Sequence, residues 1–385
     1  MKIIIIGTAY PYRGGLAAFN ERLAREFAIQ GHEVEMVTFS LQYPSFLFPG
    51  KTQYSAEPAP ADLKIQRAIN SIHPLNWWRE GKKIAKKQPN LVIIKFWLPF
   101  MAPCFATIAR RIKKITNRKT RVISILDNII PHEKRIGDRG LTQYFVNSVD
   151  GFVAMSRSVL NDVNRFDKHK PKTFSPHPLY DHFGEKISKQ EALRKLALDE
   201  KQQYMLFFGI IRDYKGLDLL LKAYADKRFR TMNLKLIVAG EFYNNANPYF
   251  ALEENLGLKN EIVWHPHFIP DSEVKYYFCA ADMIVQPYKT ATQSGVTQIA
   301  YHFEKPMLVT NVGGLGEMVP DQKVGYVVEP NEKAVADALF DFFTGQKEPL
   351  YAENLKIEKE KYSWGRMTEA ITSLANMNQL DNKMI

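Results

Sequence analysis

Residues 282–317, DMIVQPYKTATQSGVTQIAYHFEKPMLVTNVGGLGE, decide the fold. The apolar run up to Pro287 predicts a buried strand, and the polar segment 289–295 predicts a loop before a helix that begins near Val296. Residues 306–310 predict the next short parallel strand, which a glycine-rich loop follows. This order of strand, loop, helix, strand and loop predicts an α/β domain with a parallel sheet.

Both predicted loops leave the carboxyl ends of parallel strands, where open α/β sheets bind ligands. The free N–H groups and the dipole at a helix start favour an anion such as a diphosphate. The residues expected to bind it there are Thr292, Gln293, Ser294, Gly295 and Val296. In the second loop, Gly313 and Gly314 allow close backbone approach, and Glu317 could accept hydrogen bonds from sugar hydroxyls. The alternative is that both glycine pairs only turn the chain.

The order Asp-x4-Pro-Tyr, Ser-Gly, Lys-Pro and Gly-Gly-x-x-Glu resembles the donor site of GT-B glycosyltransferases. It is most similar to the retaining family called glycosyl transferases group 1, also known as glycosyltransferase family 4. The resemblance implies an α/β protein with two doubly wound Rossmann-like domains facing a central cleft, and a C-terminal helix that crosses back to the first domain. It also implies a glycosyltransferase of the hexosyltransferase type.

One departure from this family concerns two glutamates that many members carry eight positions apart in this segment. An ungapped match places Ala291 and Ile299 there, and a slip of one residue places Thr292 and Ala300 there. Neither register supplies a carboxylate. The chain therefore either holds its donor through the segment 292–294 or has lost catalysis.

The chain length of 385 residues predicts two domains, because a typical domain has about 150 residues. A content of 45% apolar residues is enough for two hydrophobic cores. The expected division is an acceptor-side domain at 1–180, a linker at 181–202, a nucleotide-sugar donor domain at 203–360, and a helix at 361–385 that packs back on the first domain.

The net charge of +11 is concentrated in the N-terminal half, where residues 62–121 contain fifteen Lys or Arg against Asp62 and Glu80. This asymmetry predicts peripheral contact with an anionic membrane, with a solvated helix face as the alternative. Nucleic acid is not an expected partner, because no nucleic-acid-binding signature accompanies the charge.

Cysteine use and the absence of a long apolar run predict a cytoplasmic protein. The basic charge of residues 62–121 predicts that it is peripheral on the inner face of the cell membrane. Cys104 and Cys279 lie far apart in apolar surroundings, which fits a reducing compartment. The start MKIIIIG predicts a buried strand rather than a signal peptide. The longest apolar run, 96–109, is shorter than the roughly 20 residues that a membrane-spanning helix needs.

Two stretches of the N-terminal half contain candidate site residues. Gly14 and Gly15 precede a predicted helix without the G-x-G-x-x-G spacing, and the family resemblance assigns them to the donor diphosphate. A predicted strand ends in Asp-Asn-Ile-Ile-Pro-His-Glu, so we expect Asp127 and His132 at the edge of the sheet as catalytic candidates. The alternatives are a helix-capping cluster for His132 and a purely supporting role for Asp127.

Arg212 and Lys215 lie in a loop before a predicted helix of the second half. Their spacing lets both side chains reach one diphosphate, the arginine as a fork and the lysine as a point charge. The alternative is a solvated basic loop, and in the family the arginine is commonly found where Ile210 lies here. The resemblance further assigns the donor sugar or ribose to Gly314 and Gln298 besides Glu317, the base to Gly240, His267 and Phe268, and the acceptor side to His177 and Tyr180.

These features together predict transfer of a sugar from a UDP- or GDP-linked donor to a glycan or lipid-linked acceptor in bacterial cell-surface polysaccharide or glycolipid synthesis. Family membership implies retention of configuration, and no cofactor is expected. No metal is expected either, because the histidines lack partners at metal-ligand spacing. The alternatives are a non-catalytic nucleotide-sugar binding protein, which the missing glutamates favour, and a nucleotide-sugar epimerase, which needs a set of carboxylates that we do not find.

Overall fold

The computed structural model describes residues 1–44, 53–55, 58–131, 135–291 and 294–381. The chain forms two compact units. The first unit contains Met1–His177 and Trp364–Ile385, and the second contains Pro178–Ser363.

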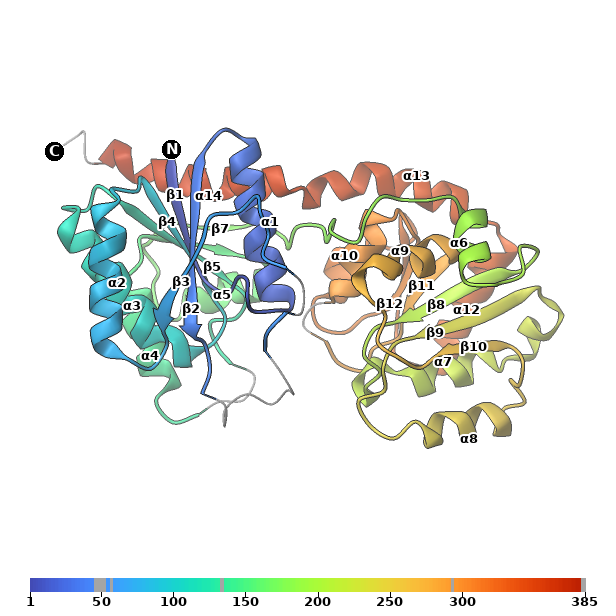
Figure 1. The fold of residues 1–385 in the computed structure, drawn as a ribbon. Helices are drawn as coiled ribbons and strands as arrows, with labels where there is room; N and C mark the ends of the chain where they lie inside the picture. The colour runs from blue at the N-terminus through green and yellow to red at the C-terminus, as the bar shows by residue number, and fades with distance from the viewer. Residues whose placement is uncertain (45–52, 56–57, 132–134, 292–293, 382–385) are drawn as a thin grey trace. The chain divides into compact units, whose positions relative to one another are not determined.

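The first unit contains a seven-stranded parallel sheet with the order β3-β2-β1-β4-β5-β6-β7 (Figure 1). Its strands are β1 (Lys2–Ile6), β2 (Glu33–Leu41), β3 (Ile65–Asn70), β4 (Leu91–Phe96), β5 (Arg121–Leu126), β6 (Gly151–Ala154) and β7 (Lys172–Phe174). Because β1 pairs with both β2 and β4, the strand order reverses between β1 and β4. Such a switch point opens a crevice at the carboxyl ends of the strands.

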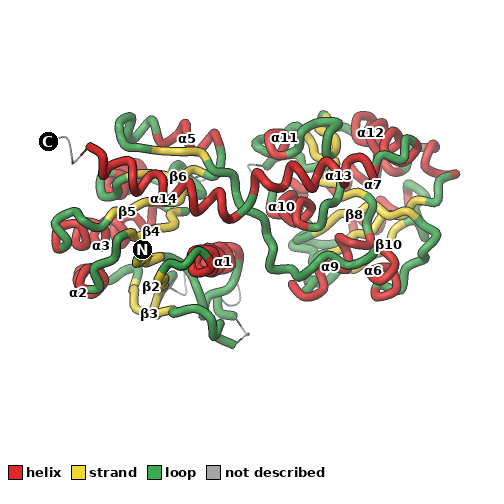
Figure 2. Tube along the Cα trace, turned by 90° about the horizontal axis from the view of Figure 1, so that it is seen from above, coloured by secondary structure: helices red, strands yellow, loops and turns green. Residues whose placement is uncertain are grey.

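Helices cover both faces of this sheet (Figure 2). They are α1 (Gly15–Ile29), α2 (Pro74–Lys86), η2 (Pro99–Met101), α3 (Ala102–Ile115), α4 (Asp138–Val146), α5 (Arg157–Val163) and α14 (Trp364–Asp381). The last helix, α14, lies against α1, β5, β6 and β7, so the end of the chain completes the core of the first unit.

The second unit contains a six-stranded parallel sheet with the order β10-β9-β8-β11-β12-β13. Its strands are β8 (Gln203–Phe208), β9 (Leu234–Ala239), β10 (Ile262–His265), β11 (Met283–Gln286), β12 (Met307–Thr310) and β13 (Gly325–Val328). The strand order reverses between β8 and β11, which pair directly. This unit therefore has a switch point of its own.

The helices of the second unit include the short η3 (Asp213–Lys215), which lies in the loop after β8 at this switch point. They are α6 (Lys189–Lys195), η3 (Asp213–Lys215), α7 (Leu217–Tyr224), η4 (Lys227–Thr231), α8 (Asn247–Asn255), α9 (Asp271–Ala280), α10 (Gly295–His302), α11 (Leu315–Met318), α12 (Glu332–Thr344), α13 (Glu348–Glu358) and η5 (Lys359–Tyr362).

The structure differs from the expected division of the chain at 181–202. This segment belongs to the second unit and contains α6, which packs against α9. Ser188 caps α6 by accepting a hydrogen bond from the N–H of Glu191, and Ala192 and Leu193 are buried in the core. The sequence also predicts a polar helix and turn at 188–203, and the structure assigns this helix to the second unit rather than to a linker.

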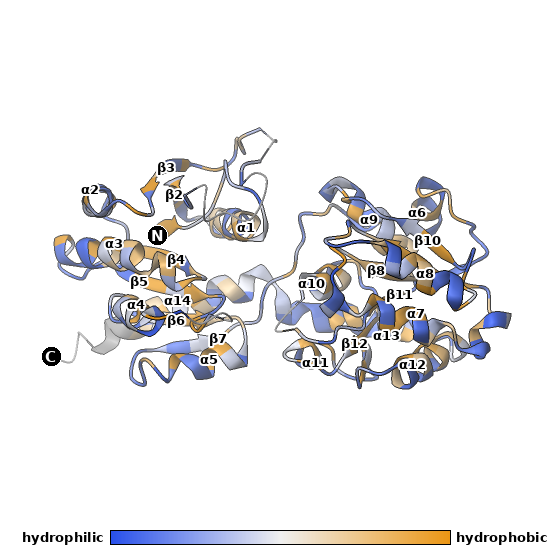
Figure 3. Ribbon diagram, turned by 90° about the horizontal axis from the view of Figure 1, so that it is seen from below, coloured by the Kyte–Doolittle hydropathy of each residue, from blue (hydrophilic) through white to orange (hydrophobic). Residues whose placement is uncertain are grey.

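Both sheets are buried on their two faces, which explains the continuous apolar runs in their strands. In β1, Ile4 and Ile6 enter one apolar cluster, while Ile3 and Ile5 enter another. The apolar colouring of the sheets and the polar outer faces of the helices follow this arrangement (Figure 3). Within the described ranges, no helix is both long enough and apolar enough to cross a membrane.

Candidate functional site

Two loops meet at the switch point of the second unit, one after β8 and one after β11. Gly216 has a φ of 70°, and a Cβ atom built on it would lie 2.0 Å from the carbonyl oxygen of Pro287. Only glycine fits this position, because any larger residue would combine a strained conformation with a backbone clash. This glycine therefore fixes the close approach of the two loops.

Lys215, in the loop after β8, is a buried cation. It is only 9% exposed, and among the described residues its ammonium has no hydrogen bond or ion pair. A Cβ atom built on Gly209 would lie 3.0 Å from its Nζ and 3.9 Å from Cγ2 of Val296, so the ammonium lies near the start of α10. Burial and, secondly, the charge of Arg212 lower the pKa of Lys215 to about 8. An ammonium without a protein carboxylate is suited to bind an external anion.

Arg212 lies beside Lys215 but is exposed at the rim of the loop. Its guanidinium lies 3.9 Å from the centroid of the Tyr243 ring, in a cation–π contact. The stacking holds the side chain near Lys215, and its five N–H donors can still face an anion. The pair thus combines one buried and one accessible positive charge.

The start of α10 offers backbone donors at the same place. Ser294 Oγ accepts a hydrogen bond of 3.2 Å from the N–H of Val296, and the Tyr288 hydroxyl lies 3.3 Å from the same oxygen. The ring of Tyr180 would lie 3.1 Å from a Cβ atom built on Gly295, so a side chain there would be crowded. Thr292 and Gln293 lie outside the described residues.

The helix α10 also contains a buried amide without partners. Gln298 is 1% exposed, and neither its Oε1 nor its Nε2 has a hydrogen-bond partner among the described residues. Gln286 accepts a hydrogen bond from Thr297 Oγ1, but its Nε2 has no partner there either. Unpaired buried amides cost stability, so these groups would gain from contact with hydroxyl groups. Ile299, at one expected glutamate position, is a buried core residue.

The other candidates of this unit lie along the same edge of the sheet. Gly240 follows β9 with a φ of 150°, and its Cβ atom would lie 2.2 Å from the carbonyl oxygen of Gly209. His267 and Phe268 follow β10 and are exposed. Gly314 and Glu317 lie at α11 after β12, and the glutamate is exposed and forms no ion pair with the described residues. The strand order therefore places the loops after β8 and β11 between the loops after β9 and β12.

No metal-binding cluster of three or more His, Cys, Asp or Glu side chains occurs among the residues that the structure describes. His265 instead contacts the hydroxyl of Tyr277 through Nδ1 at 3.1 Å. Burial, followed by the nearby His267, lowers the pKa of His265. The neutral imidazole therefore serves as a hydrogen-bonding group in the wall of this unit.

In the first unit, Gly14 lies in the loop between β1 and α1, and Asp127 follows a strand two places from β1 in the sheet order. Gly14 has a φ of 97° and caps α1, which begins at Gly15. Asp127 follows β5, and His177 packs its ring 5.2 Å from that of Phe19 on α1. His132 lies outside the described residues.

Asp127 is the partner of a buried lysine that the sequence reasoning did not identify. Lys95, in β4, is 2% exposed, and its Nζ lies 2.8 Å from Asp127 Oδ1 and 3.4 Å from the centroid of the Phe19 ring. Burial lowers the pKa of Lys95, while Asp127 opposes this shift. The ion pair links the end of β5 to β4. A charged residue inside the apolar run LVIIKFW was the signal that could have revealed Lys95.

The structure thus brings together Arg212, Lys215 and the start of α10 in the second unit. In the first unit, it places the Gly14–Gly15 pair where the loop after β1 joins α1 and pairs Asp127 with Lys95 of β4. The two acceptor-side candidates fall in different units, His177 in the first and Tyr180 in the second. Tyr288, which orients Ser294, was also missed, because an aromatic residue after a buried strand is a common core feature.

Comparisons with known proteins identify this arrangement. The sequence model of glycosyl transferases group 1 matches residues 188–384, and that of glycosyltransferase family 4 matches residues 13–178. An uncharacterized glycosyltransferase of Methanocaldococcus jannaschii is 24% identical over 366 residues, which cover 94% of this chain and 95% of the relative.

Two solved structures of Anabaena HepE have the same fold. The complex of HepE with UDP has a TM-score of 0.68 and 14% identity, covering 100% of both chains. The complex with UDP-glucose has a TM-score of 0.65 and 14% identity, covering 98% of this chain and 99% of HepE. The two parallel-sheet units therefore define a GT-B fold. The chain belongs to the glycosyl transferases group 1 family, and it is a glycosyltransferase.

Proposed function

We propose that this glycosyltransferase transfers a hexose from a nucleotide-diphosphate sugar, UDP- or GDP-linked, to a glycan or lipid-linked acceptor. The observation that carries this proposal is Lys215, a buried ammonium without a carboxylate partner in the described structure, near the start of α10. The UDP and UDP-glucose complexes of HepE, which has the same fold, support a nucleotide-sugar donor. The expected pathway is bacterial cell-surface polysaccharide or glycolipid synthesis.

The chemistry required of the second unit is charge neutralisation. As the bond between the sugar and the diphosphate breaks, the diphosphate leaves with the bonding electrons and gains negative charge. Lys215, Arg212 and the backbone donors of α10 stabilise that charge without a metal ion. The acceptor hydroxyl attacks the anomeric carbon with retention of configuration, and a phosphate oxygen of the donor takes its proton.

The remaining candidates bind the other parts of the donor in this proposal. Gln298 and Glu317 contact the sugar or ribose hydroxyls, and the loops at Gly240 and His267 contact the base. The buried amide of Gln298, unpaired among the described residues, supports this assignment. A neutral amide in this region would replace the charged contacts of the paired glutamates that the chain lacks.

We also propose peripheral contact with an anionic membrane through residues 62–121, at the cytoplasmic face. Leu75 and Trp78 are 66% and 48% exposed and lie three residues apart on α2, and Ile72, just before this helix, is 50% exposed. Exposed apolar residues beside basic ones are typical of helices that lie on a membrane. This contact would bring the enzyme to a lipid-linked acceptor.

One observation favours a second function, a nucleotide-sugar binding protein without turnover. The expected glutamate positions hold Ala291 and Ile299 or, with a slip of one residue, Thr292 and Ala300, so neither register provides a carboxylate. The two proposals share the donor site and differ in product release. An epimerase remains a weaker alternative, because the described loops do not assemble a set of carboxylates.

Thermal stabilisation by UDP-, GDP-, ADP- and TDP-sugars tests the donor class. A ligand that binds only the folded protein stabilises it by about 2.7 kcal/mol at 100 times its Kd, which is readily detected as a shift in melting temperature. We expect a UDP- or GDP-sugar to stabilise the protein more than the free sugar or the nucleoside. If none of these nucleotide sugars stabilised the protein, the proposed donor site would be wrong.

The affinity for the nucleoside diphosphate should decrease above about pH 8. The protonated form of Lys215 binds the phosphates, and its pKa in the free protein is about 8. Because the bound diphosphate raises this pKa, binding requires proton uptake above pH 8, and the affinity should approach a tenfold loss for each further pH unit. Calorimetric titration between about pH 7 and pH 9.5 measures this, and an unchanged affinity would contradict the role of Lys215.

A further inference from the structure

A basic hollow lies in the first unit at the amino ends of its strands, away from the candidate site at the carboxyl ends. It has a volume of about 600 Å³ between the ends of α3 and α4. It is lined by Arg110, Lys113, Lys114, Asn117, Arg118, Asn147 and Ser148. Apart from Lys113, its basic side chains form no ion pair with described residues.

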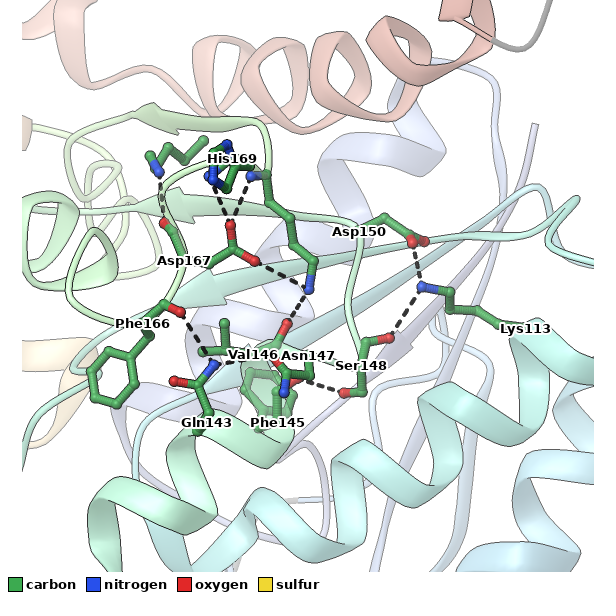
Figure 4. Close-up of polar contacts among 12 residues, drawn as sticks. Lys113, Gln143, Phe145, Val146, Asn147, Ser148, Asp150, Phe166, Asp167 and His169 are labelled. Carbon is green, nitrogen blue, oxygen red and sulfur yellow. Dashed lines mark hydrogen bonds and ion pairs between the residues drawn. The ribbon is translucent and has the colours of Figure 1, made fainter. Parts of the chain in front are cut away.

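The inner wall of the hollow is fixed by Lys113. Its ammonium is bound by the carboxylate of Asp150 and lies 3.4 Å from the carbonyl oxygen of Ser148 (Figure 4). The guanidinium of Arg110 lies 4.1 Å from the centroid of the Tyr144 ring, which directs it across to α4. These contacts hold the ends of α3 and α4 together, and the remaining cations surround the space between them.

The positive charge here exceeds what the local structure requires. The two helix C-termini carry roughly half a negative charge each, which together balance about one cation. Asp150 balances Lys113, so Arg110, Lys114 and Arg118 leave an excess of about two positive charges. The amides of Asn117 and Asn147 add neutral donors at the rim.

We propose that this hollow binds a phosphate-bearing anion, supplied either by a lipid headgroup or by a free phosphate compound. A phosphate group offers several acceptor oxygens, which match guanidinium forks, an ammonium and amide donors. The site is separate from the donor site, so it does not depend on the proposed sugar transfer.

The test measures binding of the full chain carrying Lys215→Met, which is expected to weaken phosphate binding at the donor site. One probe is a vesicle of phosphatidylcholine with or without phosphatidylglycerol, and the other is soluble glycerol 3-phosphate. We expect the double substitution Lys114→Gln with Arg118→Gln to weaken binding to the recognised probe by about tenfold or more. Binding to vesicles that contain phosphatidylglycerol, without binding of glycerol 3-phosphate, identifies a lipid headgroup as the ligand. Binding of soluble glycerol 3-phosphate identifies a free phosphate compound.

One control pair removes the same charge elsewhere. Lys227→Gln with Lys333→Gln changes exposed lysines of the second unit. We expect this control to retain binding within about threefold, since long-range attraction between exposed charges is screened by salt. Equal losses in both double variants would overturn the proposal by showing general charge attraction, and so would a lack of binding to both probes.

Discussion

Replacing Lys215 with methionine is expected to lower the affinity for a nucleoside diphosphate by about 30- to 100-fold and to raise the melting temperature of the free protein. Burial lowers the pKa of Lys215 from 10.5 to about 8, which destabilises the free protein by on the order of 3 kcal/mol at neutral pH. Methionine fills similar space without this cost. The free energy of unfolding should therefore increase by about 1–3 kcal/mol, and the melting temperature should rise by about 3 °C or more.

The contribution of Lys215 to stability depends on pH, because its pKa differs between the folded and the unfolded protein. With a pKa lower in the folded than in the unfolded protein, Lys215 makes the protein more stable as the pH rises from about 8 towards 10.5. The methionine variant should lack this increase. Calorimetric titration with UDP and with uridine, together with thermal unfolding, measures both effects.

Lys305→Met provides the matched control. Lys305 is also buried and its pKa is also lowered by burial, but it precedes β12 at the opposite edge of the sheet and lies 4.0 Å from Glu348. Its substitution should leave nucleotide affinity unchanged. If Lys215→Met reduced the affinities for UDP and uridine equally, the assignment of Lys215 to the diphosphate would be wrong.

Replacing Asp127 with asparagine should destabilise the protein by about 2–4 kcal/mol, because Lys95 would remain buried without its counter-charge. The reverse change, Lys95→Met, should cost less, since the Asp127 side chain is 22% exposed and can be hydrated. The double variant should recover much of the stability lost in Asp127→Asn. Chemical denaturation of the three variants measures these differences.

Asp62→Asn is the control for this pair. Asp62 forms an ion pair with Arg25 at 2.6 Å, but the two side chains are 56% and 36% exposed. Exposed pairs contribute little, so the cost should stay below about 1 kcal/mol. Equal stability losses for Asp62→Asn and Asp127→Asn would contradict the buried character of the Lys95–Asp127 pair.

The fold class could be predicted because continuous apolar runs and glycine loops alternate along the chain. The stretch around β11 shows this clearly: its buried strand, its loop and the helix α10 lie close to their predicted positions. Strand order was available only through the family resemblance, because parallel pairing joins segments that are distant in the sequence. The limits of the units were less predictable, since a polar segment such as 188–195 can be a linker or the exposed face of a helix.

The sequence predicted which charged residues form the candidate site, but it did not predict which of them are buried or what they contact. The spacing of Arg212 and Lys215 indicates that both can reach one anion, but burial of one and exposure of the other depend on Gly209, Tyr243 and the loop after β11. The Lys95–Asp127 pair joins residues of neighbouring strands more than thirty positions apart. No local pattern specifies such a contact.

Release of the nucleoside diphosphate from the donor tests the central proposal most directly. The purified protein is incubated with the nucleotide sugar that stabilises it, with and without membrane extract as a source of acceptor, and the released UDP or GDP is quantified. We expect release that increases with the extract and that falls strongly in Lys215→Met but not in Lys305→Met. Stabilisation by the nucleotide sugar without any release would contradict sugar transfer and would support the binding-protein alternative.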